Sequence, residues 1–278
     1  MQISSSKCVA CGNCVPICPM GAIAINPESN RAEIDHPNCV ECYQCFRGMS
    51  QEHLNPTVVR SLRKVLGWMR LRFEPEPDVC PTAAFEPDEL SWPRIVRRAF
   101  SDVTATHEST GIHGRGTEEV KTNDVTRRVQ NGEAGFVVEF GRPSVGVWFR
   151  DIDRMTTRLA EAGAEFEHNN PVTHLMTDRA RGHIRKDVLG EKVLSAIVEF
   201  KIPLGRVDEM LDVIETTAPT LDTVVSLGIG AVCDSDGSNP VPEIMSRRGY
   251  SVVRGKTNLG LGRATNQETT ETELEVTR

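Results

Sequence analysis

The chain has 278 residues, 38% of them hydrophobic and 26% charged, and its formal net charge is −7. This length suits about two domains, and the composition is ordinary for a globular protein. The negative net charge argues against general nucleic-acid binding, which requires a basic surface. No stretch approaches the ~18 consecutive apolar residues of a membrane span. The start, M-Q-I-S-S-S-K, lacks the apolar segment of a secretory signal.

Eight of the nine cysteines lie N-terminal to residue 81 and form two sets. The first set comes from the run C-V-A-C-G-N-C-V-P-I-C-P, and its members are Cys8, Cys11, Cys14 and Cys18. The second set comes from the run C-V-E-C-Y-Q-C, and its members are Cys39, Cys42 and Cys45. Its fourth position holds Met49, and the next Cys-Pro pair is Cys80-Pro81. Thiolates at this spacing suit a cubane iron–sulfur cluster, because one tight turn can direct three sulfurs to one centre.

These runs resemble the bacterial-type dicluster ferredoxins over about residues 1–90. The segments M-G-A-I-A-I, after Cys18-Pro19, and T-A-A-F, after Cys80-Pro81, are similar to that family's strands. The resemblance implies two [4Fe-4S] clusters, and the fourth cysteine of each run would bind the other cluster. The implied ligands of the first cluster are Cys8, Cys11, Cys14 and Cys80. The implied ligands of the second cluster are Cys39, Cys42, Cys45 and Cys18. The chain departs from the family by a long insertion at 46–79.

Other interpretations of the cysteines fit less well. Zinc sites usually take separated C-x2-C pairs, and a disulfide framework would imply secretion. If Cys80 is an incidental buried cysteine, one cluster would rest on three thiolates, as a three-iron cluster or a four-iron cluster with an open iron. Cys233 is expected to be a buried structural thiol. Thiolate ligands imply a reducing, cytoplasmic location, and oxygen-sensitive clusters suggest anaerobic metabolism.

Short strands at 21–26 and 31–35 are predicted to pair across the turn N-P-E-S-N. The insertion predicts a helix that begins after Asn55-Pro56 and ends before E-P-E-P at 74–77. Its apolar residues recur at intervals of three and four: Val58, Leu62, Val65, Leu66, Met69 and Phe73. Its other side carries Arg60, Arg63, Lys64, Arg70 and Arg72. This basic side of the helix, within 57–73, either docks an acidic redox partner or is the solvated face of a packing helix.

Residues 91–134 are expected to form a linker or long loop, since 101–134 is polar and rich in Gly, Thr and His. An internal repeat follows at 135–262: V-V-E-F at 137–140 returns as I-V-E-F at 197–200. Each copy predicts a strand and a helix, with the helices near 151–162 and 205–216 and a last strand at 221–227. Two such units predict a ferredoxin-like α/β sandwich, whose layout resembles ACT-like small-ligand domains. Residues 263–278 lack apolar content and are expected to be a disordered tail.

The fold class is therefore α+β, with a dicluster module at 1–90 followed by the α/β sandwich. The favoured function is that of an electron-transfer protein or subunit, which passes low-potential electrons to or from a partner oxidoreductase. The C-terminal domain would serve docking or ligand sensing. The alternative is an iron–sulfur oxidoreductase with a small-molecule site in that domain. Its polar candidates, which form no recognisable catalytic constellation, are His107, His113, Arg115, Glu118, Lys121, Asp124 and Arg142.

Overall fold

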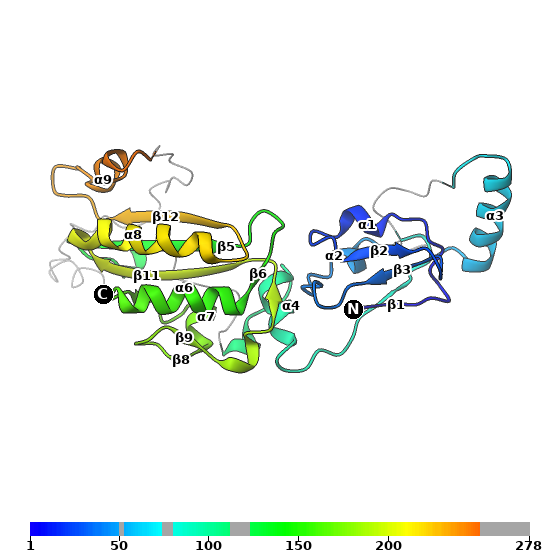
Figure 1. The fold of residues 1–278 in the computed structure, drawn as a ribbon, viewed down its shortest axis with the longest axis horizontal. Helices are drawn as coiled ribbons and strands as arrows, with labels where there is room; N and C mark the ends of the chain where they lie inside the picture. The colour runs from blue at the N-terminus through cyan, green and yellow to red at the C-terminus, as the bar shows by residue number, and fades with distance from the viewer. Residues whose placement is uncertain (50–52, 74–79, 112–122, 251–278) are drawn as a thin grey trace, which may run out of the picture.

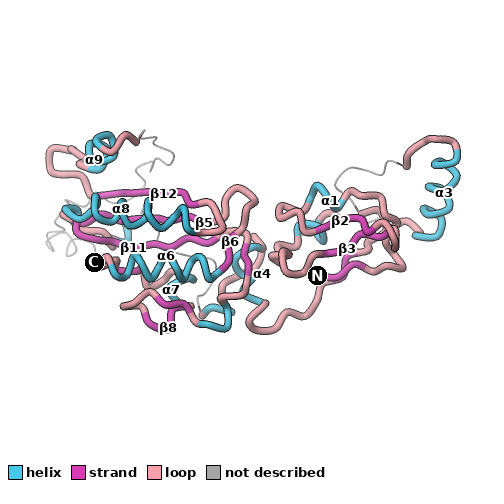
Figure 2. The backbone as a smooth tube through the Cα atoms, in the orientation of Figure 1, coloured by secondary structure: helices cyan, strands magenta, loops and turns pink. Residues whose placement is uncertain are grey.

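The structure is a computed structural model that describes residues 1–49, 53–73, 80–111 and 123–250 (Figure 1). The chain forms two packed regions along one long axis, each with its own hydrophobic core (Figure 1). The N-terminal region consists mostly of loops and short strands, whereas a sheet with helices dominates the C-terminal region (Figure 2). The mixture of helices and strands confirms the α+β class.

Two small antiparallel ladders frame the N-terminal region. β1 (Gln2–Ile3) pairs with β4 (Phe85–Glu86), so the start of the chain meets the segment that follows Cys80. β2 (Ile23–Asn26) pairs with β3 (Arg31–Ile34), which confirms the predicted hairpin. The two short helices of this region are α1 (Cys14–Ile17) and α2 (Gln44–Arg47).

The insertion contains α3 (Pro56–Trp68), whose start agrees with the sequence prediction. The Asn55 side chain accepts the N–H groups of Thr57 and Val58, which caps the first turn. The helix ends at Trp68, well before the E-P-E-P sequence at 74–77 that was expected to end it. Arg70 takes a left-handed backbone conformation with φ 58°. The N–H of Leu71 then binds the Leu66 carbonyl at 2.8 Å, as in a Schellman motif.

The C-terminal region is built on a four-stranded antiparallel sheet in the order β12-β5-β11-β7. The strands are β5 (Glu133–Phe140), β7 (Glu165–Phe166), β11 (Ala196–Pro203) and β12 (Val225–Ala231). The two long helices are α6 (Phe149–Glu161) and α8 (Val207–Thr217), which lie beside the sheet in Figure 1. The repeated strands β5 and β11 are neighbours, with Val138 opposite Val198. The predicted helices therefore exist, while the last strand begins at Val225, because a 3-10 turn at Ala218–Thr220 is followed by a bend at 221–223.

The core of this region lies between the sheet and the helices. Phe136 stacks on Phe200 with 5.0 Å between ring centroids, and both side chains are buried beside Met155 and Met210. Alternate residues of β5 and β11 point to this core, as a half-covered sheet requires. The smaller elements are α5 (Asn123–Thr126), β6 (Val147–Trp148), α7 (Pro171–His174), β8 (Met176–Asp178), β9 (His183–Ile184), β10 (Lys192–Val193) and α9 (Val241–Arg247).

The segment 91–134, expected to be a linker, carries the helix α4 (Ile95–Ser101). Val96 and Phe100 belong to the core of the C-terminal region, so this part of the segment is packed. The linker prediction rested on the polar composition of 101–134, whereas the apolar residues of α4 come just before that stretch. The predicted tail at 263–278 lies outside the described residues.

Candidate metal centres

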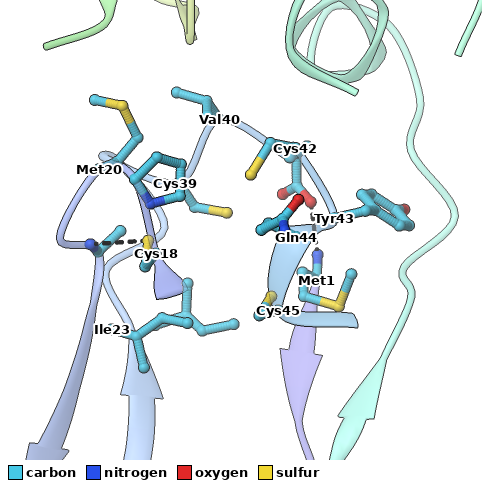
Figure 3. A pocket seen from close by; sticks show the side chains of 14 residues that line it. Met1, Cys18, Met20, Ile23, Cys39, Val40, Cys42, Tyr43, Gln44 and Cys45 are labelled. Atoms are coloured by element: carbon cyan, nitrogen blue, oxygen red, sulfur yellow. Dashed lines mark hydrogen bonds and ion pairs between the residues drawn. The ribbon is translucent and has the colours of Figure 1, made fainter. Parts of the chain in front are cut away.

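Two cavities in the N-terminal region are each lined by four cysteines. The first cavity is lined by Cys8, Cys11, Cys14 and Cys80. The second is lined by Cys18, Cys39, Cys42 and Cys45, whose sulfur atoms point into a shared space (Figure 3). The first cavity has a volume of about 340 Å³ and the second a volume of about 390 Å³, each including some space open to solvent, so the two are of similar size. The thiols are thus grouped in the way that the resemblance implied, while iron ligation stays a prediction.

The two cysteine loops share the same backbone turn. Ala10 and Glu41, each two residues after the first cysteine of a run, have φ values of 53° and 54°. Gly12 and Tyr43, two residues further along, have φ values of 89° and 59°. Residues other than glycine rarely adopt positive φ. Such turns direct successive backbone N–H groups inward and create a concave site for a negatively charged group.

The fourth cysteines also occupy matching turns. The N–H of Ala22 donates to the sulfur of Cys18 at 3.3 Å, and the N–H of Ala84 donates to the sulfur of Cys80 at 3.4 Å. The residue before each donor, Gly21 or Ala83, has a positive φ. The sequence after Cys80 therefore reproduces the turn after Cys18, as the two Cys-Pro pairs predicted.

Main-chain pairing explains how Cys80 reaches the first cavity. Met49 and Cys80 form an isolated parallel β-bridge, in which the N–H of Cys80 donates to the Gly48 carbonyl at 2.8 Å. Met49 occupies the position where the second run would have its fourth cysteine. The chain thus leaves the ferredoxin-like path after Gly48 and rejoins it at Cys80, beside the residue that replaced the missing ligand.

The chemistry of the donor set fits iron. Burial, together with the neighbouring thiols of the same cavity, raises the pKa of Cys14 and of Cys45 to about 12. Burial also raises the pKa of Cys39, to about 11. Such thiols keep their protons at neutral pH unless a positive charge enters the cavity. Bound metal cations supply that charge and deprotonate the thiols that coordinate them.

The arrangement suits a cluster better than a single ion. Among the described residues, no three His, Cys, Asp or Glu side chains are placed so that they could hold one metal ion. A cubane cluster distributes four thiolates over four irons, so its ligands surround a cavity and do not converge on one point.

Arginine side chains bind the outward-facing carbonyls of both cysteine loops. In the first loop, Arg60 donates to the Cys8 carbonyl at 3.1 Å, and Arg63 donates to the Val9 carbonyl. In the second loop, Arg97 donates to the Cys39 carbonyl at 2.7 Å, and Arg47 donates to the Cys42 carbonyl at 2.6 Å. These contacts satisfy the hydrogen-bonding capacity of four loop carbonyls and tie the loops to α2, α3 and α4.

The second loop is also held by a buried acidic residue. Glu41 is buried and pairs with Arg94 of the segment leading into α4 at 2.6 Å and with the amino group of Met1 at 2.9 Å. Sequence reasoning missed these contacts. The spacing of Arg94, Arg97 and Arg98 at three and four residues was the available signal, since it places cations on one side of a short helix.

The remaining candidates lie away from the cysteines or outside the described residues. His107 is buried against Phe100, with 4.7 Å between ring centroids. Arg142 is exposed and lies 3.4 Å from a Glu139 oxygen. His113, Arg115, Glu118 and Lys121 fall outside the described residues, and the Asp124 side chain is not described. Cys233 is exposed, contrary to the prediction of a buried thiol, because it lies in the loop that follows β12.

Comparison with known proteins supports the resemblance of the N-terminal region. The family model of the 4Fe-4S dicluster domain matches residues 7–48, which contain every cysteine of the two runs but not Cys80. Searches of the curated proteins and of the solved structures found no match. None of the helices in the described ranges is long and apolar enough to cross a membrane. The N-terminal region is therefore similar to 4Fe-4S dicluster domains, as the cysteine spacing predicted.

Proposed function

We propose that this chain is an electron-transfer protein or subunit that carries two [4Fe-4S] clusters. It would pass low-potential electrons to or from a partner oxidoreductase. The supporting observation is the presence of two similar cavities, each with four cysteine thiols, in a region similar to dicluster domains. One cluster would be held by Cys8, Cys11, Cys14 and Cys80. The other would be held by Cys39, Cys42, Cys45 and Cys18.

When bound, each cluster would supply a centre that accepts and releases one electron. The chain's own residues would hold it, shield it from water and adjust its reduction potential. The Cys8 sulfur accepts N–H groups from Ala10 at 3.4 Å and from Ala32 at 3.3 Å. Hydrogen bonds to ligating sulfur favour the reduced, more negative state and so raise the potential. Four thiols per cavity leave no iron open to a substrate, which favours electron transfer over catalysis.

For the C-terminal region we propose a ferredoxin-like sandwich that serves docking or ligand sensing. The strand order β12-β5-β11-β7, with α6 and α8 as the two crossover helices, supports this layout. A sensing role is supported by contacts between the C-terminal region and the second cysteine loop, one made directly by Lys192 of β10 and one made by Glu191 through Arg97. Lys192 donates to the Asn38 side chain at 3.1 Å, and Glu191 pairs with Arg97 of α4.

We also propose that an acidic redox partner approaches the basic residues of 57–73. Arg60 and Arg63 bind loop carbonyls, so the exposed cations available to such a partner are Lys64, Arg70 and Arg72. We also propose a reducing, cytoplasmic setting and anaerobic metabolism, because the thiols must stay reduced and the clusters must be protected from oxygen.

Anaerobic reconstitution tests the proposal. We expect about eight irons and about eight acid-labile sulfides per chain, the content of two cubanes. The reduced protein should give electron paramagnetic resonance signals of two interacting clusters. About four irons per chain, or bound zinc in place of iron, would contradict the two-cluster proposal.

A further inference from the structure

The apolar side of α3 faces away from the rest of the protein. Val58, Val65 and Trp68 are 63%, 53% and 86% exposed. Leu62 and Met69 are exposed on the same side, at the helical intervals of three and four that join these residues into one stripe. Leu54 and Leu71 extend the apolar surface beyond both ends of the helix.

Contacts on the opposite side fix this orientation. Val59 is buried, Arg60 binds the Cys8 carbonyl, and Arg63 binds the Val9 carbonyl. The sequence left open whether the basic side of this helix docks a partner or is solvated. In the structure, the guanidinium groups of Arg60 and Arg63 bind the first cysteine loop. The stripe of Val58, Leu62, Val65, Trp68 and Met69 therefore lies on the outer surface, at the end of the molecule far from the C-terminal region (Figure 1).

The charge of this segment is opposite to that of the whole chain. Every charged residue in 54–73 is basic, although the formal net charge of the protein is −7. Lys64 of α3 and Arg70 and Arg72, which follow the helix, are exposed. A helix with Leu and Trp on one side and Lys and Arg beside them has the composition that binds in the plane of an anionic lipid surface.

We propose that α3 binds an anionic lipid surface, with its outer stripe at the boundary between headgroups and acyl chains. Lys64, Arg70 and Arg72 would contact lipid phosphates, and Trp68 would lie at the headgroup level that tryptophan favours. A flat surface fits better than a protein groove. A groove would have to enclose the helix, but the inner side of α3 is already held by the cysteine loop.

Lipid binding would bring the first cysteine cavity close to the membrane, because Arg60 of α3 contacts the carbonyl of Cys8. This inference goes beyond the proposed function. It concerns the outer side of α3, requires no electron transfer, and assigns Lys64, Arg70 and Arg72 to lipid in place of an acidic protein partner.

Sedimentation with vesicles tests the inference, using the full chain after anaerobic reconstitution. We expect binding to vesicles of phosphatidylcholine mixed with phosphatidylserine, weaker binding to phosphatidylcholine alone, and loss of binding as salt rises. The double variant Val58→Asp/Val65→Asp should reduce partitioning by at least about tenfold. Lys64→Glu should reduce it by about tenfold through charge reversal. The tryptophan emission should shift to the blue on binding, and Trp68→Phe should abolish that shift.

Val103→Asp is the matched control, because Val103 is 73% exposed but lies outside α3. It should bind vesicles as the wild type does, and circular dichroism and iron content should be the same in all variants. Wild-type protein that ignores anionic vesicles would overturn the proposal, as would a double variant that binds them equally well. Two further results would also overturn it. One is a dimer that depends on Val58 and Val65, and the other is an acidic protein that binds α3 while lipid does not.

Discussion

Arg97 of α4 forms an ion pair with Glu191 within the C-terminal region, while the same guanidinium donates to the Cys39 carbonyl at 2.7 Å. Arg97 is only 4% exposed, and it also binds the carbonyls of His36 and Pro37. One side chain therefore connects the second cysteine loop with the C-terminal region. A change in that region could reach the second cavity through this contact.

Arg97→Ala should lower the free energy of unfolding by about 3 kcal/mol, because it leaves the half-buried carboxylate of Glu191 and the carbonyls of Pro37 and Cys39 without this donor. The second cluster should also be lost more readily, because the Cys39 carbonyl no longer has its hydrogen bond from Arg97. Denaturant unfolding and iron analysis measure the two effects.

Glu191→Gln provides the comparison, because it removes the ion pair and leaves the loop carbonyls bound to Arg97. We expect this variant to keep its iron. Equal iron loss in the two variants would show that the ion pair, and not the carbonyl contacts, supports the loop.

Cys80→Ser should convert or destabilise the first cluster and leave the second intact. Cys80 lines the first cavity, and its sulfur accepts the N–H of Ala84. Iron content should fall, and the electron paramagnetic resonance spectrum should lose the interaction between two clusters. Cys233→Ser, at an exposed thiol, is the matched control and should leave the iron content unchanged. If the two serine variants behave alike, Cys80 is not a ligand.

Asp102 gives a pH-dependent prediction. Burial favours the protonated carboxyl, but hydrogen bonds from Thr104, Arg47 and Arg98 prevail and hold the pKa of Asp102 below its ordinary value. A carboxylate with a lowered folded-state pKa stabilises the protein above its unfolded-state pKa, and this stability is lost as the pH falls through the folded-state pKa. Asp102→Asn should therefore cost about 2 kcal/mol near neutral pH and progressively less below about pH 4.

Chemical denaturation of both proteins across this pH range measures that difference. Thr104→Val is a useful control, because it removes one hydroxyl donor to Asp102 and keeps both arginine contacts. A cost of Asp102→Asn that does not change with pH would contradict the lowered pKa.

Phe200→Ala tests whether the two regions are stabilised by separate cores. Phe200 stacks on Phe136, and both are buried in the C-terminal core. We expect a loss of about 3–5 kcal/mol in the stability of the C-terminal region. The visible absorption of the clusters should be unchanged before unfolding begins. An immediate loss of cluster absorption in the folded variant would mean that the cores are coupled more tightly than their separate packing indicates.

Local sequence determined the cysteine loops, their turns and the start of α3. Spacing within each cysteine run fixes a turn of a few residues, and Asn55-Pro56 caps a helix through contacts with its own first turn. The repeat at 137–140 and 197–200 likewise predicted two strands, which pair with each other as β5 and β11. The turns, the helix start and the individual strands depend on neighbours in the chain, so their signals were present in the sequence, whereas the pairing of β5 with β11 joins distant segments.

Contacts between distant residues decided the rest. Periodicity showed that α3 has an apolar and a basic side, but the cysteine loop determined which side faces inward, through carbonyls that bind Arg60 and Arg63. The position of Cys80 depended on its bridge to Met49, and the exposure of Cys233 depended on the end of β12. A side-chain pattern sets which residues share a surface, whereas only packing between remote segments sets what that surface meets.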